Sequence, residues 1–202
     1  MSLSVPSLDT CALRESGVWR AALALALGVL FGFGLLYSLL ATGLAGALFP
    51  LQASGSLIEH DGRLVGSALV AQPFADARYF QPRPSAAGYD PMAATGSNQA
   101  RSNPALLQRI ADTRRAVAVR DGIDVDAVAG DLLTQSGSGL DPHVSVAAAR
   151  QQVARVARAR GLPEARVQAL LEAQREPRQF GLLGQPRVNV LRLNLALDAI
   201  AR

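Results

Sequence analysis

The sequence predicts a single N-terminal transmembrane helix followed by a soluble α+β domain. No charged residue lies between Arg20 and Glu59, and the stretch from Ala21 to Pro50 is almost wholly apolar. About 150 residues follow, enough for one domain with its own core. In that part of the chain, turn and cap signals separate several helical patterns from a few strand-like ones.

The apolar stretch is long enough to cross a bilayer, because a hydrocarbon core about 30 Å thick needs about 20 apolar residues of helix. A cleaved signal peptide is the main alternative, with a basic flank before the stretch and Ala45-Gly46-Ala47 as its cleavage site. The apolar regions of such peptides are only about 7–15 residues long, which favours the retained helix.

The placement of basic residues predicts the orientation of this helix. Arg14 and Arg20 precede it, whereas the first basic residue after it is Arg63. Basic residues near a membrane prefer the cytoplasmic side. The only cysteine, Cys11, then lies on the reducing side, so that the domain has no disulfide. The predicted organisation is a cytoplasmic tail over 1–20, a transmembrane helix over 21–46 and an extracytoplasmic domain over 47–202.

The first part of the domain is predicted to be a hairpin followed by irregular chain. Between residues 56 and 71, apolar pairs flank Asp61-Gly62, which suits a tight turn with positive φ. Residues 72–104 are rich in Pro, Gly, Ser and Asn, which favours irregular structure. We expect four aromatic side chains to order this segment by packing: Phe74, Tyr79, Phe80 and Tyr89.

Helices dominate the remainder of the predicted domain. Asn103-Pro104 begins a helix that Asp121-Gly122 ends, and Ser145 caps another that Gly161 ends. The other predicted elements are a short helix over 126–133, a helix from 163 to 176, a strand over 188–191 and a terminal helix over 193–201. The arginines Arg150, Arg155, Arg158 and Arg160 are interpreted as a solvated helix face.

The composition excludes several kinds of enzyme. The formal charge is +4, all twenty basic residues are arginine, and there is no lysine. This removes the P-loop, Schiff-base chemistry and the Ser-x-x-Lys nucleophile. The chain has two histidines, and its one cysteine is predicted to lie on the other side of the membrane from them. A Cys/His zinc site is therefore not expected. We predict no catalytic residue, no metal site, no tightly held cofactor and no nucleic-acid partner.

Small residues along the apolar helix indicate that it also packs against a partner in the membrane. Residues spaced by four lie near one another on a helix surface and let another helix approach closely. Chance spacing in a span rich in alanine and glycine is the alternative. The candidate packing residues are Gly28, Gly32, Gly34, Ser38, Thr42 and Gly46.

The loop over residues 134–143 is the other candidate site. It could bind a cation, dock a partner, or supply Asp141 and His143 as an acid/base pair. Alternatively it only links two helices, with its glycines serving turn geometry and its aspartate bonding local backbone. The partner-contact candidates are Ser138, Gly139, Leu140, Asp141, Pro142 and His143, together with Gln185, Pro186, Arg187 and Asn189.

Several blocks of the chain, taken in order, resemble the C subunit of the Kdp potassium-transporting P-type ATPase complex. They include Phe-Pro-Leu-Gln-Ala-Ser-Gly-Ser-Leu (49–57), Ser-Gly-Leu-Asp-Pro-His-Val-Ser (138–145), and the segments 65–74, 79–86, 96–98, 102–104, 155–162 and 183–198. They extend over nearly the whole chain after the span.

The resemblance implies a non-catalytic accessory subunit in a bacterial inner membrane. Its partners would be a channel-like potassium-translocating subunit, a P-type ATPase subunit and a small single-span subunit, with membrane lipid around the helix. ATP and potassium are then handled by the complex. The chain would assemble or stabilise the other subunits and raise the pump subunit's apparent ATP affinity.

The resemblance also implies nucleotide contact near Ser67 and Gln72. The charge distribution argues against it, because ATP is cytoplasmic and this segment is predicted to lie outside. Two alternatives from other classes are a membrane-anchored extracytoplasmic binding protein for a small anion or peptide, and an exported hydrolase that uses Asp141 and His143.

Overall fold

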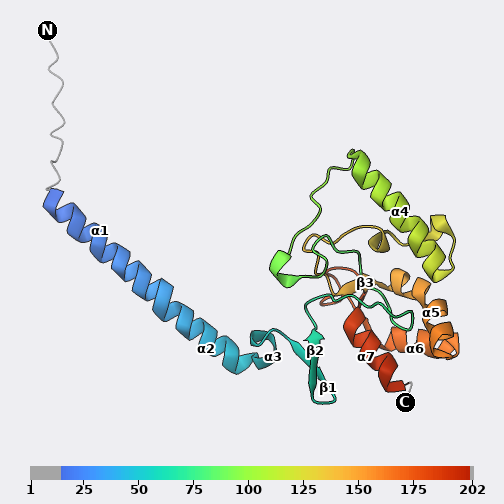
Figure 1. Cartoon of the computed structure of the whole chain (residues 1–202). Helices are drawn as coiled ribbons and strands as arrows, with labels where there is room; N and C mark the ends of the chain where they lie inside the picture. The colour runs from blue at the N-terminus through green and yellow to red at the C-terminus, as the bar shows by residue number, and fades with distance from the viewer. Residues whose placement is uncertain (1–14, 201–202) are drawn as a thin grey trace, which may run out of the picture. The chain divides into compact units, whose positions relative to one another are not determined.

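The computed structural model describes residues 15–200 of the chain. Two compact units are separated between Ser54 and Gly55. The first is dominated by a long apolar helix, and the second is a mixed domain of helices and two small sheets (Figure 1). The predicted fold class, one N-terminal transmembrane helix followed by an α+β domain, is confirmed.

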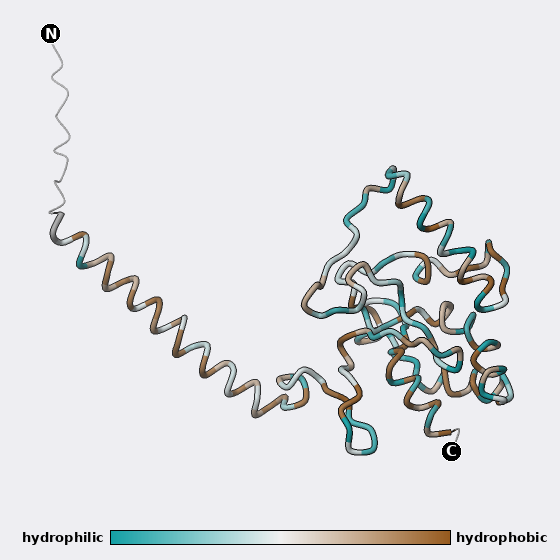
Figure 2. Tube along the Cα trace, in the orientation of Figure 1, coloured by the Kyte–Doolittle hydropathy of each residue, from teal (hydrophilic) through white to brown (hydrophobic). Residues whose placement is uncertain are grey.

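The apolar helix is continuous but changes its winding in the middle. It comprises α1 (Glu15–Val29), a π-helical stretch η1 (Leu30–Tyr37) and α2 (Ser38–Leu48). Residues Gly17–Leu48 form the one helix of the described chain that is long and apolar enough to cross a membrane (Figure 2). At 1.5 Å per residue it is about 48 Å long, more than a hydrocarbon core requires. Which residues lie within the bilayer stays a prediction.

A single helical turn and the predicted hairpin follow. The turn is α3 (Pro50–Ala53), and the hairpin pairs β1 (Leu57–His60) with β2 (Arg63–Ser67) in antiparallel register. Asp61 and Gly62 have φ values of 50° and 73°. Positive φ at both central residues is what a two-residue turn between twisted strands requires. The hairpin prediction is confirmed.

Two helices begin and end where the sequence predicts. They are α4 (Pro104–Asp121) and α5 (Val146–Arg160). Asn103 and Ser145 cap them, because each side chain accepts a hydrogen bond from a backbone N–H of the first turn. The glycine after each helix takes a left-handed conformation, with φ near 69° and 65° respectively. These local signals therefore determine both helices.

The prediction of a short helix over residues 126–133 is wrong. The structure has 3-10 turns there, separated by extended backbone at Ala129. Within the second of these turns, the Asp131 carboxylate accepts hydrogen bonds from the Ser145 N–H and hydroxyl, which ties the segment to the start of α5. Among the described residues, the 3-10 turns of the domain are η2 (Pro91–Ala93), η3 (Val125–Ala127) and η4 (Gly130–Leu132).

The sequence predicts only one of the three strands of the second small sheet. Its strand order is β3 (His143–Ser145), β5 (Arg187–Asn189), β4 (Arg175–Glu176), and both pairings are antiparallel. β3 lies at the end of a segment predicted as a loop, and β4 lies where a helix was predicted to continue. Strands of two or three residues are too short to leave a periodic signal in the sequence.

Two helix boundaries are corrected by this sheet. α6 (Glu164–Ala173) ends before the predicted residue 176, because the following residues pair with β5. α7 (Val190–Ile200) begins within the strand predicted over 188–191. It begins there because the Asn189 side chain accepts a hydrogen bond from a backbone N–H of its first turn.

The core lies among α5, α6, α7 and the second sheet. α5 packs against α4 and α6, and α6 packs against α7. Phe80 is fully buried in this core although it comes from the irregular segment. The other fully buried apolar side chains include Val144, Ala148, Ala149, Val156, Val167, Leu171, Val188, Leu193 and Leu197.

Buried amide side chains hold the irregular segment against the helices. Asn194 of α7 bonds both the N–H and the C=O of Phe80, at 2.9 and 3.0 Å. Gln152 of α5 bonds those of Gln81, at 2.8 and 3.1 Å. Backbone polar groups in a core must find partners. The two amides supply them, so chain without a strand partner can lie inside the domain.

The predicted solvated face of α5 is wrong for Arg155. This side chain is only 7% exposed, and its Nε lies 2.6 Å from Oδ1 of the buried Asp121. Its Nη1 donates to the carbonyls of Ala77 and Tyr79 in the irregular segment. Arg155 therefore joins α4, α5 and the irregular segment.

Arg160 departs from the same prediction. Its guanidinium lies 4.8 Å from the ring centre of Tyr79, and its Nη2 lies 2.8 Å from Oδ1 of Asp198. Arg150 and Arg158 are exposed, as predicted. The spacing of arginines along a helix does not distinguish solvated side chains from those that reach back to neighbouring segments.

We predict that Arg155→Ala lowers the free energy of unfolding of the full chain by about 3 kcal/mol. It leaves the buried Asp121 carboxylate with Arg120 as its remaining arginine partner. It also removes the donor to the Ala77 and Tyr79 carbonyls. Urea unfolding in detergent, followed by circular dichroism, measures this loss. Arg158→Ala is the matched control on the same helix and should change it by less than about 0.5 kcal/mol. Equal losses in both variants would contradict the prediction.

Candidate functional site

The two blocks predicted to contact a partner lie side by side in the folded domain. In the β3–β5 pair His143 is opposite Asn189, and Ser145 is opposite Arg187. A cavity of about 480 Å³ opens beside these strands, and we call it the His143 pocket. Its lining residues are Arg83, Asp131, Asp141, His143, Val144, Ser145, Gln185, Pro186 and Arg187.

Asp141 and Arg83 fix one wall of the His143 pocket. Arg83 Nη1 lies 3.0 Å from Asp141 Oδ2, and its Nη2 donates to the carbonyl and hydroxyl of Thr134. Asp141 Oδ1 accepts the backbone N–H of His143 at 3.0 Å. Burial raises the pKa of Asp141, but the hydrogen bonds from His143 and Arg83 outweigh it and lower the pKa to about 2. This carboxylate is therefore charged at any physiological pH.

His143 lies between two carboxylates. Its Nδ1 is 3.6 Å from Asp141 Oδ1, and its Nε2 is 3.4 Å from Glu176 Oε2. Glu176 also lies 2.9 Å from Arg187 Nε. The pocket and its edge therefore bring the acidic side chains of Asp131, Asp141 and Glu176 together with the arginines Arg83 and Arg187. Such a surface suits a polar partner with complementary charges.

The hydroxyl groups near His143 are occupied by local bonds. Ser145 Oγ caps α5 and lies 3.1 Å from Asp131 Oδ1. Ser138 Oγ accepts the backbone N–H of Leu140 at 3.1 Å. A hydrolytic site needs a nucleophile within hydrogen-bond reach of its base. The described geometry therefore gives no support to the hydrolase alternative.

Gly139 shows why the loop needs glycine. Its φ is +72°, and a Cβ at this position would lie 2.8 Å from the carbonyl oxygen of Thr95 and 2.9 Å from Cβ of Ala87. The loop is therefore packed closely on the irregular segment. This packing agrees with turn geometry as the role of Gly139.

The candidate contact residues differ in their accessibility. Asn189 is 2% exposed, and its Nδ2 donates to the Ala68 carbonyl at 2.8 Å, so its side chain serves the fold. Gly139 is also buried. The exposed candidates are Ser138, Gln185 and Arg187, and the half-buried ones are Leu140, Asp141, Pro142, His143 and Pro186.

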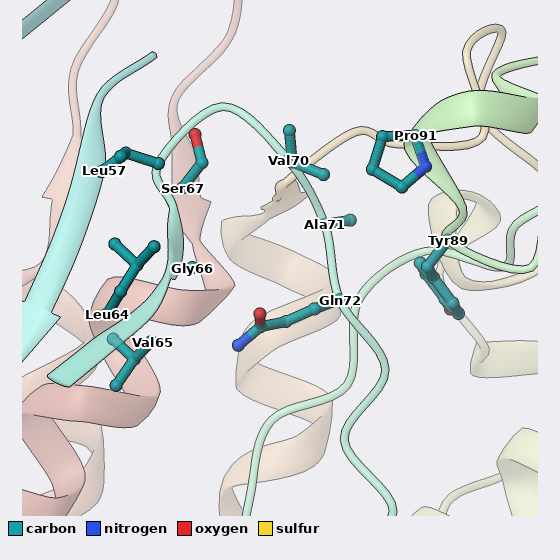
Figure 3. Close-up of a pocket in the computed structure, with 10 residues that line it drawn as sticks. All are labelled: Leu57, Leu64, Val65, Gly66, Ser67, Val70, Ala71, Gln72, Tyr89 and Pro91. Atoms are coloured by element: carbon teal, nitrogen blue, oxygen red, sulfur yellow. The ribbon is translucent and has the colours of Figure 1, made fainter. Parts of the chain in front are cut away.

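Ser67 and Gln72 line a different pocket, of about 440 Å³, beside the hairpin (Figure 3). Ser67 Oγ lies 2.7 Å from the Gly55 carbonyl oxygen, to which it donates a hydrogen bond. The Gln72 side chain lies close to the backbone of Gly66, since a Cβ on Gly66 would lie 2.8 Å from Oε1 of Gln72. The lining residues are Leu57, Leu64, Val65, Gly66, Ser67, Val70, Ala71, Gln72, Tyr89 and Pro91, and none of them is charged.

The small residues of the apolar helix remain available for contact. None of the residues Leu30–Leu48 is buried within the described chain. The π-helical stretch contains Gly32 and Gly34, so the α-helical spacing rule does not extend through it. It does apply within α2, which contains Ser38, Thr42 and Gly46. A side chain added at Gly28, Gly32 or Gly46 would meet no other atom within 4 Å.

Three charged residues in or beside the His143 pocket are not predicted as site residues from the sequence. Arg83, Asp131 and Glu176 come from three distant parts of the chain, and only the fold brings them together. Of the three, only Arg83 could have been found from the sequence, because it lies within the segment 79–86 that carries the family resemblance.

Comparisons with known proteins identify close relatives. The family described as KdpC, K+-transporting ATPase, c chain, matches residues 19–199. A Xanthomonas campestris pv. campestris protein named potassium-transporting ATPase KdpC subunit is 68% identical over 198 residues, which cover 98% of this chain and 92% of the relative. Proteins of the same name from Shewanella putrefaciens and Methylococcus capsulatus are 52% and 54% identical, covering 91% and 83% of this chain and 90% of each relative.

Asp141→Asn is predicted to change the pH dependence of stability. The pKa of Asp141 is about 2 in the folded chain, against 3.8 for a carboxyl without these partners. A group whose pKa is lowered by folding contributes stability that is present above about pH 4 and is lost as the pH falls towards 2. The variant should therefore be less stable at neutral pH and lose less stability over this acid range.

Unfolding of the full chain at several pH values measures this slope. Asp126→Asn is the control, since it removes a carboxylate whose side chain is 94% exposed and lies outside the pocket. The slope should change more in Asp141→Asn than in this control. An unchanged slope in Asp141→Asn would count against the ion pair with Arg83.

Proposed function

Because the chain belongs to the KdpC family, the c chains of K+-transporting ATPases, we propose that it is a non-catalytic subunit that assembles and stabilises the pump. The family match over residues 19–199 carries this proposal. The single candidate membrane helix supports attachment to the same membrane as the pump. In this proposal a separate P-type subunit hydrolyses ATP and a channel-like subunit passes potassium.

The helix is the first proposed contact with the pump. Its surface is apolar and unburied, and its small residues leave room for a neighbouring helix. Ser38 Oγ lies 3.2 Å from the Phe33 carbonyl oxygen, so its hydroxyl is satisfied within the helix and adds no polar cost in lipid. A subunit that needed only an anchor would not need this pattern of small residues.

The His143 pocket is the second proposed contact. Ion pairs tie its loops to the rest of the domain, so its polar groups are pre-organised for a partner. Gln185 and Arg187 are exposed at its rim and are available to another subunit. We place this contact on the extracytoplasmic side, in line with the predicted orientation.

An effect on ATP affinity would then be indirect. The hairpin pocket around Ser67 and Gln72 has no charged lining residue. Phosphate groups are normally bound by basic side chains or by several backbone N–H groups at a helix N-terminus. This composition, together with the predicted orientation, supports an effect transmitted through subunit contact rather than through nucleotide binding by this domain.

The double variant Ser38→Leu with Thr42→Leu is predicted to release the chain from the pump. Two added leucine side chains would keep a neighbouring helix from approaching α2. The measurement is co-purification in mild detergent through a tag on another subunit. Leu40→Phe with Leu44→Phe adds bulk on the opposite side of α2 and should leave co-purification intact. Co-purification of the Ser38→Leu, Thr42→Leu variant at wild-type levels would contradict the proposed helix contact.

The orientation can be tested by labelling with a membrane-impermeant maleimide. Cys11, which lies outside the described residues, should be protected in spheroplasts and become reactive after lysis. Met92→Cys, made in a Cys11→Ser background, should react before lysis, because Met92 is 94% exposed on the domain. The reverse pattern would place the domain in the cytoplasm and reopen direct contact with ATP.

A further inference from the structure

The connection between β4 and β5 exposes an unusual group of apolar side chains. Residues 177–186, here called the Phe180 loop, carry Phe180 at 84%, Leu182 at 80% and Leu183 at 60% exposure. Single exposed apolar residues are common, but three within four positions form a patch. A patch of this kind marks a surface that is covered when the protein binds a partner.

The Phe180 loop holds these side chains in a fixed arrangement. Gln179 and Leu183 exchange backbone hydrogen bonds, both of 3.0 Å, across the tip. Phe180 has a φ of 54°, an uncommon conformation for a residue with a large side chain. Such strained positions cluster where a surface binds something. The loop therefore presents its apolar side chains in advance of binding, which reduces the entropy lost on contact.

The charges around the loop favour a protein over a lipid surface. Arg187 and Arg192 lie 2.9 and 3.8 Å from carboxylate oxygens of Glu176, and Arg175 lies 3.8 Å from Glu172. Recognition of anionic lipid typically uses clusters of about 4–8 basic residues with their charge available. Here Arg175, Arg187 and Arg192 are each held beside a glutamate, so their charge is not freely available to lipid headgroups. Two carboxylates do not balance three arginines, however, and the remaining positive charge suits an acidic protein surface. An aromatic anchor surrounded by paired charges is typical of the centre of a protein interface.

We propose that the Phe180 loop inserts into an apolar pocket on another subunit of the pump, and that this pocket has an acidic rim. Arg178, beside Phe180, has no ion pair within the described chain and donates to Gln185 at 3.1 Å, so it is the residue that the acidic rim would meet. The loop ends at residues that line the His143 pocket, so both surfaces form one continuous contact. The inference rests on the proposed function, because it requires an assembled pump.

The direct test places a photo-crosslinking residue at the loop tip. Phe180→p-benzoylphenylalanine is introduced into the full chain, and the pump is purified through a tag on another subunit and irradiated. The expected product is a covalent adduct between this chain and another pump subunit. The same substitution at Val119 of α4, which is also 84% exposed, is the matched control and should give little adduct.

A second variant measures the strength of the contact. Phe180→Ala with Leu182→Ala should speed the loss of the chain from the purified pump by about tenfold, as expected for a truncated interface anchor. Val119→Ala should not. Both side chains are exposed, so the fold should be unaffected, and circular dichroism verifies this.

The outcomes separate this inference from the proposed function. Adducts with lipid alone, no adduct, or equal yields at positions 180 and 119 would overturn the loop contact while leaving the subunit role intact. Absence of the wild-type chain from the purified pump would overturn the proposed function and, with it, this inference.

Discussion

The amide side chains of Gln152 and Asn194 hold a stretch of chain without a strand partner in the centre of the domain. Arg155 adds a third such contact through two backbone carbonyls. A buried backbone group without a partner costs about as much as a lost hydrogen bond, so these three residues permit Phe80 to enter the core. The packing of α5 and α7 on the irregular segment follows from them.

The same principle organises the candidate site. The His143 pocket is built on two short strands and a loop, so backbone hydrogen bonds between strands fix little of its shape. Its shape depends on side-chain contacts, chiefly Arg83 with Asp141 and Arg187 with Glu176. Polar groups that cross between segments thus both close the domain and form the surface that we propose as a partner contact.

The two units of the chain are suited to different surroundings, and each leaves a surface open for contact. The helix has an apolar surface throughout, as lipid requires, and its small residues let a partner approach. The domain buries its apolar side chains except at a few places, of which the Phe180 loop is the most concentrated. Each unit therefore keeps a surface that its own fold does not use, which is what an accessory subunit of a membrane pump needs.

The sequence alone determined the apolar helix, the hairpin turn at Asp61-Gly62, and the limits of α4 and α5, because length, turn residues and caps act within a few neighbouring positions. It also carried the family resemblance. Tertiary structure alone decided that Arg155 is buried, that Asn189 ends a strand and caps α7, and that Arg83 meets Asp141. Each of these depends on a partner many residues away or on strands too short for a periodic pattern, so no local signal could reveal it.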